Sequence, residues 1–291
     1  IKYTNAVYYP FQGTPSVPWD MFDLSKYRAH SWHCLDDLEK RSPYAVLYTS
    51  LNCPYHCSYC NVHTLYGDHK VRYRPLEDVY KELDYFAQKG IRNLKIWDEC
   101  FTLNHKRVEK ICDYIIDNDY KFNIWAYARL KQVNPIMLSR MWMAGIRWIA
   151  YGFESTKDKK SVQALETVLL TKECGLNINA NFMFGLPGET LDDMKASLEF
   201  AIQQNFEWAN FQVALPYPGS AWWDSLEEKP TDWARFSQFH PNMYGNPEAI
   251  KFREYAFRTY FTRPEYLDMI GSKFGDKAVR HIEEMLKWQI K

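Results

Sequence analysis

The sequence lacks an excess of charge of either sign, because Lys and Arg together number 36 and Asp and Glu together also number 36. A formal net charge of zero removes the usual electrostatic argument for a nucleic-acid partner, and we expect none. No continuous apolar stretch is long enough to cross a bilayer, so we expect no membrane span. The chain opens Ile1-Lys2-Tyr3 with neither an initiator Met nor a signal-peptide pattern, and we expect it to be part of a longer protein.

The sequence also lacks the cysteine density of a disulfide-stabilised domain, since 291 residues contain an odd total of seven cysteines. Three of them, Cys53, Cys57 and Cys60, follow C-x3-C-x2-C spacing within eight residues. Cysteine thiolates bind iron–sulfur clusters, and a 4Fe–4S cluster has four iron corners. Three ligands leave one iron open to a substrate or cofactor. A thiolate-held cluster needs a reducing compartment, so we expect a cytoplasmic protein.

The same spacing is compatible with other interpretations. A structural zinc site with a distant fourth ligand and a set of buried free cysteines both fit it. Cys34 could also act as a fourth cluster ligand, which would close the open iron. That arrangement would favour a non-catalytic iron–sulfur electron-transfer protein.

Apolar runs and amphipathic stretches alternate regularly after Pro43. The predicted strands cover residues 45–51, 93–97, 122–127, 147–151, 176–184 and 208–215. The predicted helices between them cover residues 75–89, 104–118, 135–144, 162–173 and 191–204. Repeated βα units imply a parallel sheet with right-handed crossovers. We therefore predict an α/β fold with a partial (β/α)6 TIM-like barrel, and a doubly wound open sheet is the main alternative.

We divide the chain into three regions. Residues 1–43 are rich in proline and aromatic residues and are predicted to form an extended N-terminal arm or linker. Residues 44–220 form the predicted barrel. Residues 221–291 form a mostly helical C-terminal extension, which we expect to cap the barrel.

Polar residues follow the predicted strands, at the end where barrels of this kind carry their catalytic face. The cysteine triplet follows the first predicted strand and so lies at this end. The polar residues after the later strands are Asp98, Glu99, Cys100, Arg129, Glu154, Ser155 and Glu189. A simpler role for Asp98 or Glu189 is to cap the following helix. Cys100 is a candidate hydrogen-atom donor, but a structural role as a buried thiol fits it better.

Three ordered segments together resemble the radical S-adenosylmethionine (SAM) superfamily. They are the cysteine motif with Tyr59, the stretch Gly152-Phe153-Glu154-Ser155, and the stretch from Asn181 to Glu189. The resemblance covers roughly residues 44–220. It implies that Cys53, Cys57 and Cys60 hold a 4Fe–4S cluster that reductively cleaves SAM, giving a 5′-deoxyadenosyl radical that acts on a substrate.

The resemblance also implies roles for other residues. Tyr59 and the segment that includes Phe184 would lie near the adenine, and Glu154 with Ser155 would meet the ribose. Asp98 and Glu99 would meet the methionine amino group. Arg129 is a plausible partner for the carboxylate, which its planar guanidinium suits.

Within the superfamily, the stretches 96–104, 151–155 and 214–220 are similar to the cobalamin-binding class. That similarity implies a cobalamin-dependent methyltransferase acting on a small molecule or natural-product intermediate, with flavodoxin or ferredoxin as the electron donor. The sequence has no Asp-x-His-x-x-Gly motif of a corrin-binding domain. A cobalamin-independent radical SAM enzyme that catalyses cyclisation, rearrangement or oxidation is the alternative. The segment after Thr156 is shorter than in relatives.

Overall fold

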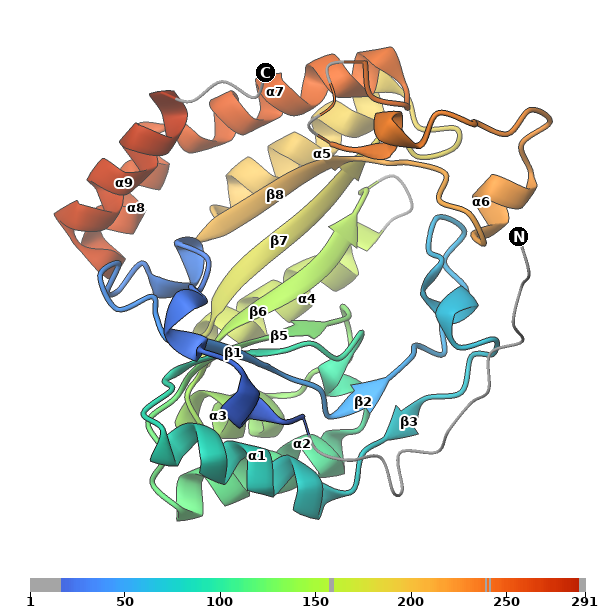
Figure 1. The fold of residues 1–291 in the computed structure, drawn as a ribbon. Coiled ribbons are helices and arrows are strands. Elements are labelled where there is room, and N and C mark those ends of the chain that lie inside the picture. Colours follow the sequence, from blue (N-terminus) through green and yellow to red (C-terminus); the bar gives the residue numbers. More distant parts are fainter. Residues whose placement is uncertain (1–16, 157–159, 239, 241, 288–291) are drawn as a thin grey trace.

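The computed structural model describes residues 17–156, 160–238, 240 and 242–287. Its centre is a six-stranded sheet in the order β1-β4-β5-β6-β7-β8, and every neighbouring pair is parallel. The strands are β1 (Tyr44–Leu47), β4 (Asn93–Ile96), β5 (Asn123–Ala128), β6 (Ile146–Glu154), β7 (Asn177–Phe184) and β8 (Trp208–Val213). Figure 1 shows the sheet curving into an open half-barrel.

The strand order separates the two predicted architectures. Each new strand is added beside the previous one, so the chain winds in one direction across the sheet. A doubly wound sheet instead reverses direction at a switch point. The predicted partial barrel is therefore confirmed.

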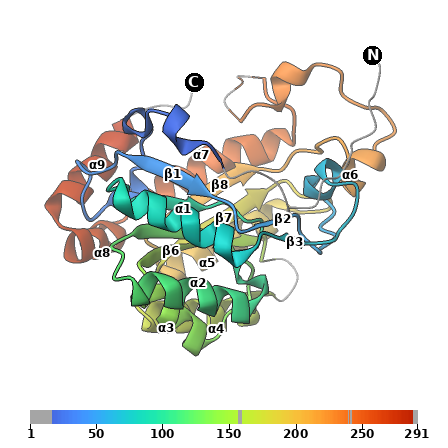
Figure 2. The ribbon, with the colours of Figure 1, turned by 60° about the horizontal axis from the view of Figure 1, so that its bottom comes forward.

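Helices follow the strands and cover the outer face of the sheet (Figures 1 and 2). They are α1 (Leu76–Gln88), α2 (His105–Asp117), α3 (Pro135–Met143), α4 (Lys160–Glu173) and α5 (Leu191–Gln204). In α1, Val79, Leu83 and Phe86 recur at helical spacing, and all three are fully buried. The helix ends before Gly90, whose φ of 68° suits a left-handed C-terminal residue.

The first predicted strand is interrupted in the structure. β1 ends at Leu47, and a second short strand, β2 (Ser50–Leu51), pairs antiparallel with β3 (Arg72–Tyr73). The break coincides with a long-range contact, because the Thr49 N–H donates to the Asp98 carboxylate at 2.6 Å instead of to a neighbouring strand. The prediction of one strand over 45–51 was wrong at this point, and the small β2–β3 ribbon was missed.

The described part of the N-terminal arm, from residue 17, makes three short 3-10 turns, which are η1 (Trp19–Met21), η2 (Leu24–Lys26) and η3 (Trp32–Cys34). Two further 3-10 turns lie in strand-to-helix loops of the barrel, η4 (Val62–Leu65) and η5 (Phe101–Leu103). The arm inserts the Trp32 side chain against the Trp125 and Trp148 rings, with centroid distances of 5.0 and 5.2 Å. Residues 1–16 of the predicted arm lie outside the described residues.

The C-terminal region begins with two short elements, α6 (Ala221–Asp224) and η6 (Trp233–Phe236). Three longer helices follow, α7 (Pro247–Phe261), α8 (Pro264–Phe274) and α9 (Asp276–Lys287). Helix α7 lies along β8 and buries Phe252 and Tyr260 against the sheet (Figure 1). In the described part of the chain, no helix has the length and apolar character needed to cross a membrane.

Candidate functional site

The three cysteines of the motif lie on one loop after β2, at the end of the sheet where the parallel strands finish. All three are free thiols and all are partly exposed. The loop runs from Cys53 to the η4 turn and returns through β3. The first strand therefore delivers the thiols to the carboxyl edge of the sheet, as the sequence predicts.

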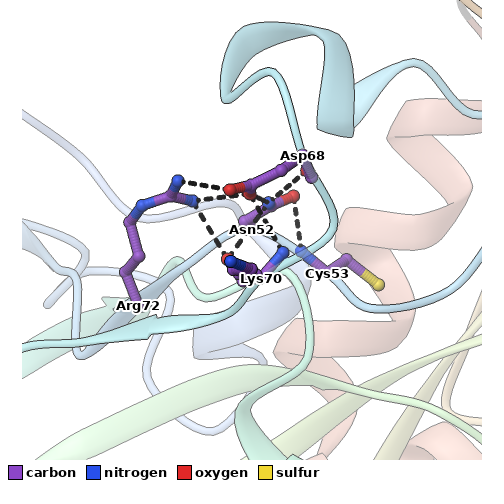
Figure 3. A network of polar contacts seen from close by, with 5 residues as sticks. All are labelled: Asn52, Cys53, Asp68, Lys70 and Arg72. Atoms are coloured by element: carbon purple, nitrogen blue, oxygen red, sulfur yellow. Dashed lines mark hydrogen bonds and ion pairs between the residues drawn. The ribbon is translucent and has the colours of Figure 1, made fainter. Parts of the chain in front are cut away.

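A polar network closes this loop at its base (Figure 3). The Asn52 carboxamide accepts from the Cys53 N–H at 2.8 Å and donates to the Asp68 carbonyl at 2.6 Å and the Lys70 carbonyl at 3.2 Å. The Arg72 guanidinium donates two hydrogen bonds to the Asp68 carboxylate, at 3.0 and 2.9 Å. Asn52 is 2% exposed and has a φ of 73°, a conformation that Asn tolerates better than most residues. The sequence analysis missed this network because its members are 20 residues apart.

The far side of the loop contacts the segment that follows β8. The Trp222 N–H donates to the Ser58 carbonyl at 2.8 Å, and the Asn61 carboxamide donates to the Pro218 carbonyl at 3.2 Å. Gly219 has a φ of 86°, and a side chain there would overlap the loop. The cysteine loop is thus held at its base and at its outer edge.

Arg129 extends from the end of β5 to the cysteines. Its Nη1 lies 3.6 Å from the Cys57 sulfur, and its guanidinium lies 4.1 Å from the centre of the Tyr55 ring. Burial raises the pKa of both Cys53 and Cys60, whereas nearby backbone N–H groups lower it. The Arg129 guanidinium therefore lies beside the sulfur of Cys57, the middle cysteine of the motif.

Cys100 is buried behind this loop and donates to the Gln132 carbonyl oxygen at 3.1 Å. The Gln132 amide in turn contacts the Tyr55 hydroxyl. Burial raises the pKa of the Cys100 thiol, so the structure keeps it protonated. Its role as a hydrogen-atom donor stays a prediction. Gln132 carried no motif by which the sequence could identify it.

The two acidic residues after β4 have different environments. Asp98 is 1% exposed, and its carboxylate accepts from the Thr49 N–H at 2.6 Å and from the Thr49 and Ser50 hydroxyls at 2.5 and 2.6 Å. Glu99 is exposed, yet partial desolvation of its carboxyl group and then the charge of Asp98 raise its pKa. Glu99 is also an electrostatic neighbour of Cys53. Asp98 therefore anchors the start of the loop, and Glu99 is the carboxylate free to face a ligand.

Glu154 ends β6 at an irregularity in the pairing with β7. Its φ of 60° is unusual for a residue with a side chain, and backbone strain of this kind often accompanies function. The Glu154 carboxylate folds over Gly152, where an added methyl group would overlap it. Burial and then the Glu154 charge raise the pKa of Tyr59, so the Tyr59 hydroxyl lies in the same region and stays protonated.

Glu189 links two loops and does not cap the next helix. It accepts from the Ser155 hydroxyl at 2.6 Å and from the Gly185 N–H at 2.7 Å. The capping box of α5 is formed by Thr190 and Asp193 instead. The capping role considered for Glu189 is therefore wrong, and the residue positions Ser155 beside the end of β7.

The Phe184 side chain points away from the cysteine edge. It is fully buried against Phe211 and Phe252, with ring centroids 5.6 and 5.0 Å apart. In strand alternation its neighbour Met183 faces the inner side of the sheet. A contact between position 184 and a ligand at the rim can therefore come only from its backbone.

The remaining cysteines lie elsewhere. Cys34 contacts the Asn93 carbonyl oxygen at 3.4 Å at the amino end of β4, so it cannot complete the Cys53 site. Cys112 is buried in the core, and Cys174 is partly buried. The predicted short segment runs from Thr156 to Val162, and its residues 157–159 lie outside the described residues.

The chemistry of the donor set fits an iron–sulfur cluster, because cysteine thiolates are the usual protein ligands of such clusters. Three cysteine thiols share one loop, and each of Cys53 and Cys60 is an electrostatic neighbour of Cys57. Within the described ranges, no three His, Cys, Asp or Glu side chains converge to hold one metal ion.

The radical SAM superfamily pattern matches residues 47–201. The chain is 25% identical over 271 residues to an uncharacterized methyltransferase of Pyrococcus horikoshii, covering 87% of this chain and 57% of the relative. It is also 25% identical over 219 residues to the bacteriochlorophyllide d C-8(2)-methyltransferase of Chlorobaculum tepidum, covering 67% and 48%. The chain thus spans about half the length of these relatives.

Among solved structures, the fold is similar to that of the radical SAM methyltransferase TsrM from Kitasatospora setae with cobalamin and a [4Fe-4S] cluster bound. The TM-score is 0.56 at 20% identity, covering 64% of this chain and 39% of that one. Coproporphyrinogen III oxidase from Escherichia coli, a radical SAM enzyme, gives a TM-score of 0.51 at 14% identity, covering 74% and 51%. At these identities the likeness supports the half-barrel fold alone.

Proposed function

The chain belongs to the radical SAM superfamily, and on that premise we propose that it transfers a methyl group to a small substrate in a cobalamin-dependent reaction. Cys53, Cys57 and Cys60 hold the 4Fe–4S cluster in this proposal. When bound, the cluster supplies the electron that cleaves SAM. The observation that carries the proposal is the loop of three free thiols at the carboxyl edge of the half-barrel, with Arg129 beside Cys57 at 3.6 Å.

The residues around the loop fit the polar groups of SAM. Arg129 provides a guanidinium for the carboxylate of the methionine part. Glu99 provides the carboxylate for the amino group, and we assign this role to Glu99 because the Asp98 oxygens already accept hydrogen bonds from Thr49 and Ser50.

A second set of residues fits the nucleoside part. Glu154 accepts from the ribose hydroxyls, and Glu189 keeps Ser155 in place through a 2.6 Å hydrogen bond. Tyr59 borders the adenine, and Phe184 contacts the adenine only through its backbone.

The methyl-transfer step rests on the relatives. Two curated relatives that match most of this chain are named as methyltransferases, and the TsrM structure contains cobalamin. In this proposal a corrin carries the methyl group, and a protein electron donor such as flavodoxin or ferredoxin reduces the cluster.

Anaerobic reconstitution with iron and sulfide tests the proposal. We expect a reduced-cluster electron paramagnetic resonance spectrum that changes when SAM is added. Methyl-labelled SAM should then transfer its label to added reduced cobalamin. Arg129→Ala should weaken the response to SAM, and Arg147→Ala, which removes an arginine at the start of β6, should leave it unchanged.

Two other outcomes contradict parts of the proposal. A spectrum that ignores SAM would favour an electron-transfer protein. Formation of 5′-deoxyadenosine without label in the corrin would favour a cobalamin-independent radical enzyme that catalyses cyclisation, rearrangement or oxidation.

A further inference from the structure

Lys95 is a buried lysine on the inner face of the sheet. It lies on β4, in register with Val46 of β1 and Trp125 of β5. Side chains alternate along a strand, so Leu94 and Ile96 pack on the outer side and Lys95 points into the half-barrel. Only 4% of Lys95 is exposed.

Aromatic rings surround the Lys95 ammonium group. Its Nζ lies 3.2 Å from the centre of the Trp97 ring, 4.3 Å from that of Trp125 and 5.0 Å from that of Tyr127. Cation–π contacts of this kind favour the charged form. The Tyr127 hydroxyl, at 3.5 Å, is its hydrogen-bond acceptor.

The Lys95 ammonium group is under-satisfied for its depth. It has three N–H donors, and the one hydrogen bond to Tyr127 is long. Among the residues that the structure describes, no carboxylate forms an ion pair with it, and Glu99 is its acidic electrostatic neighbour. A buried charge without a partner is unfavourable, so the site is suited to an anion.

The charge state of Lys95 is sensitive to what binds there. Burial lowers the pKa of Lys95 to about 7, and the charge of Glu99 opposes that shift. On the side of the arm, burial and then Lys95 lower the pKa of His30, so His30 is neutral and offers no competing charge. A bound anion would favour the ammonium form.

Trp97 and Glu99 follow Lys95 in sequence, and both interact with its ammonium group. Trp97 is 42% exposed and stands at the rim, and Glu99 is an electrostatic neighbour of both Lys95 and Cys60. Lys95 therefore lies farther from the carboxyl edge of the sheet than Glu99, which follows the end of β4. A molecule held at Lys95 would extend past Trp97 toward the cysteines.

Amide side chains cover the inner face of β7 and β8, which β5 and β6 separate from β4. The Asn210 amide donates to the Asn179 and Asn181 carbonyl oxygens, both at 2.9 Å. Asn181 and Asn210 are partly exposed on β7 and β8. This inner face therefore offers a cation, hydrogen-bonding amides and flat aromatic walls.

We propose that Lys95 binds the carboxylate of a planar aromatic substrate whose ring packs against Trp97 and Tyr127. The proposal deepens the proposed function and rests on it for the direction of the reacting end, which lies toward the cysteine loop. The ammonium group supplies the point charge for the carboxylate, and the rings supply the stacking surface.

Two probes of the same shape and different charge test the proposal. These are 2-naphthoate and its neutral amide, 2-naphthamide, titrated into the reconstituted full chain and followed by tryptophan fluorescence and saturation-transfer NMR. We expect the wild-type protein to bind the acid about tenfold more tightly than the amide. Lys95→Gln should abolish this preference, and Lys95→Arg should retain part of it because the charge is kept.

Lys172→Gln is the control, because Lys172 is a partly buried lysine that lies on α4, where it donates to the Gln204 carbonyl. It should leave the preference unchanged. Circular dichroism and cluster absorbance check that each variant folds. A wild-type protein that binds neither probe, or shows no preference for the acid, would overturn the proposal. A preference that survives in Lys95→Gln would do the same.

The two proposals fail separately. If the spectrum of the cluster responds to SAM but the naphthoate preference does not depend on Lys95, only the substrate anchor is wrong. If the preference depends on Lys95 but the spectrum ignores SAM, Lys95 is an anion site in a protein without the proposed activity.

Discussion

The polar side chains at the two ends of the sheet have different environments. At the amino end, Asn93 donates to the Lys40 carbonyl at 2.7 Å, and Asn123 donates to the His33 carbonyl at 3.1 Å and the Asn93 side chain at 3.0 Å. At the carboxyl end, free thiols are partly exposed and Lys95 lacks an ion-pair partner among the described residues. One end is closed by the arm and gives stability. The other end leaves groups available for ligands, as in other barrels.

The largest expected effect concerns the carboxyl end. Cys57→Ala should abolish SAM cleavage, because the variant loses a cluster ligand and the sulfur beside Arg129. Iron content and 5′-deoxyadenosine formation measure the effect. Cys174→Ala is the control, since Cys174 is a partly exposed thiol at the end of α4, and it should keep full activity. Equal activity in both variants would remove the cluster assignment.

The next effect concerns the amino end. Trp32→Ala should lower the free energy of unfolding by about 3–5 kcal/mol, because it leaves a cavity between Trp125 and Trp148. Chemical denaturation measures the loss. Below the unfolding transition, iron content and the spectral response to SAM should match those of the wild type. If the variant kept normal stability but failed to bind iron, the claim that the amino end contributes stability and not ligand binding would be wrong.

The amino end should also make stability depend on pH through His33. Burial lowers the pKa of His33 to about 3, and the His33 side chain is fully buried. The unfolded chain therefore takes up a proton below about pH 6.5 that the folded chain does not. Stability from neutral His33 is complete above that pH and falls by about 2 kcal/mol between pH 6.5 and 5.

His33→Phe isolates this effect. The difference between wild-type and variant unfolding free energies, measured by denaturation at each pH, should change by that amount over the same window. His30 is the ionisable group whose charge would lower the pKa of His33, and it is present in both proteins. Parallel curves for the two proteins would contradict the burial of a neutral imidazole.

At the carboxyl end, the base of the cysteine loop should be sensitive to Asn52. Asn52→Gly keeps the left-handed backbone accessible but removes the hydrogen bonds to Cys53, Asp68 and Lys70. We expect a loss of about 1–2 kcal/mol and slower cluster reconstitution. Asn52→Ala adds backbone strain and should be worse. If Asn52→Gly reconstitutes at the wild-type rate, the network does not position the thiols.

The smallest expected effect concerns Gly152. A methyl group at this position overlaps the Glu154 carboxylate, which is the flexible end of a side chain and can move aside. Gly152→Ala should therefore weaken SAM binding about tenfold or less while cluster content stays normal, as measured by titration of the cluster spectrum. Gly271→Ala, in α8, is a control on a helix away from the rim. A change in both variants would indicate a general loss of stability.

Much of the fold follows from local patterns. The apolar positions of α1 and the glycine after it define that helix, and the repeated βα order allows only a few parallel topologies. The break after Leu47 was not predictable, because it depends on Asp98, which is 49 residues from Thr49. The β2–β3 ribbon was missed because each of its strands has only two residues, too few to show an alternating pattern in the sequence.

The site shows the same division. Cys53, Cys57 and Cys60 are close in sequence, so their spacing alone indicates a shared ligand. Asp98 and Glu99 are adjacent and chemically alike. Only the structure shows that the Asp98 carboxylate accepts hydrogen bonds from Thr49 and Ser50. Lys95 looked like an ordinary strand residue, because the rings around it come from two different strands.

The sequence by itself determined the alternation of strands and helices along the chain and the position of the thiols after the first predicted strand, because both depend on local spacing. Tertiary structure decided which polar groups remain available at the carboxyl end. Burial, partner distance and charge at Asp98, Glu99 and Lys95 depend on residues far apart in the chain, and they exist only once the sheet has curved around its inner face.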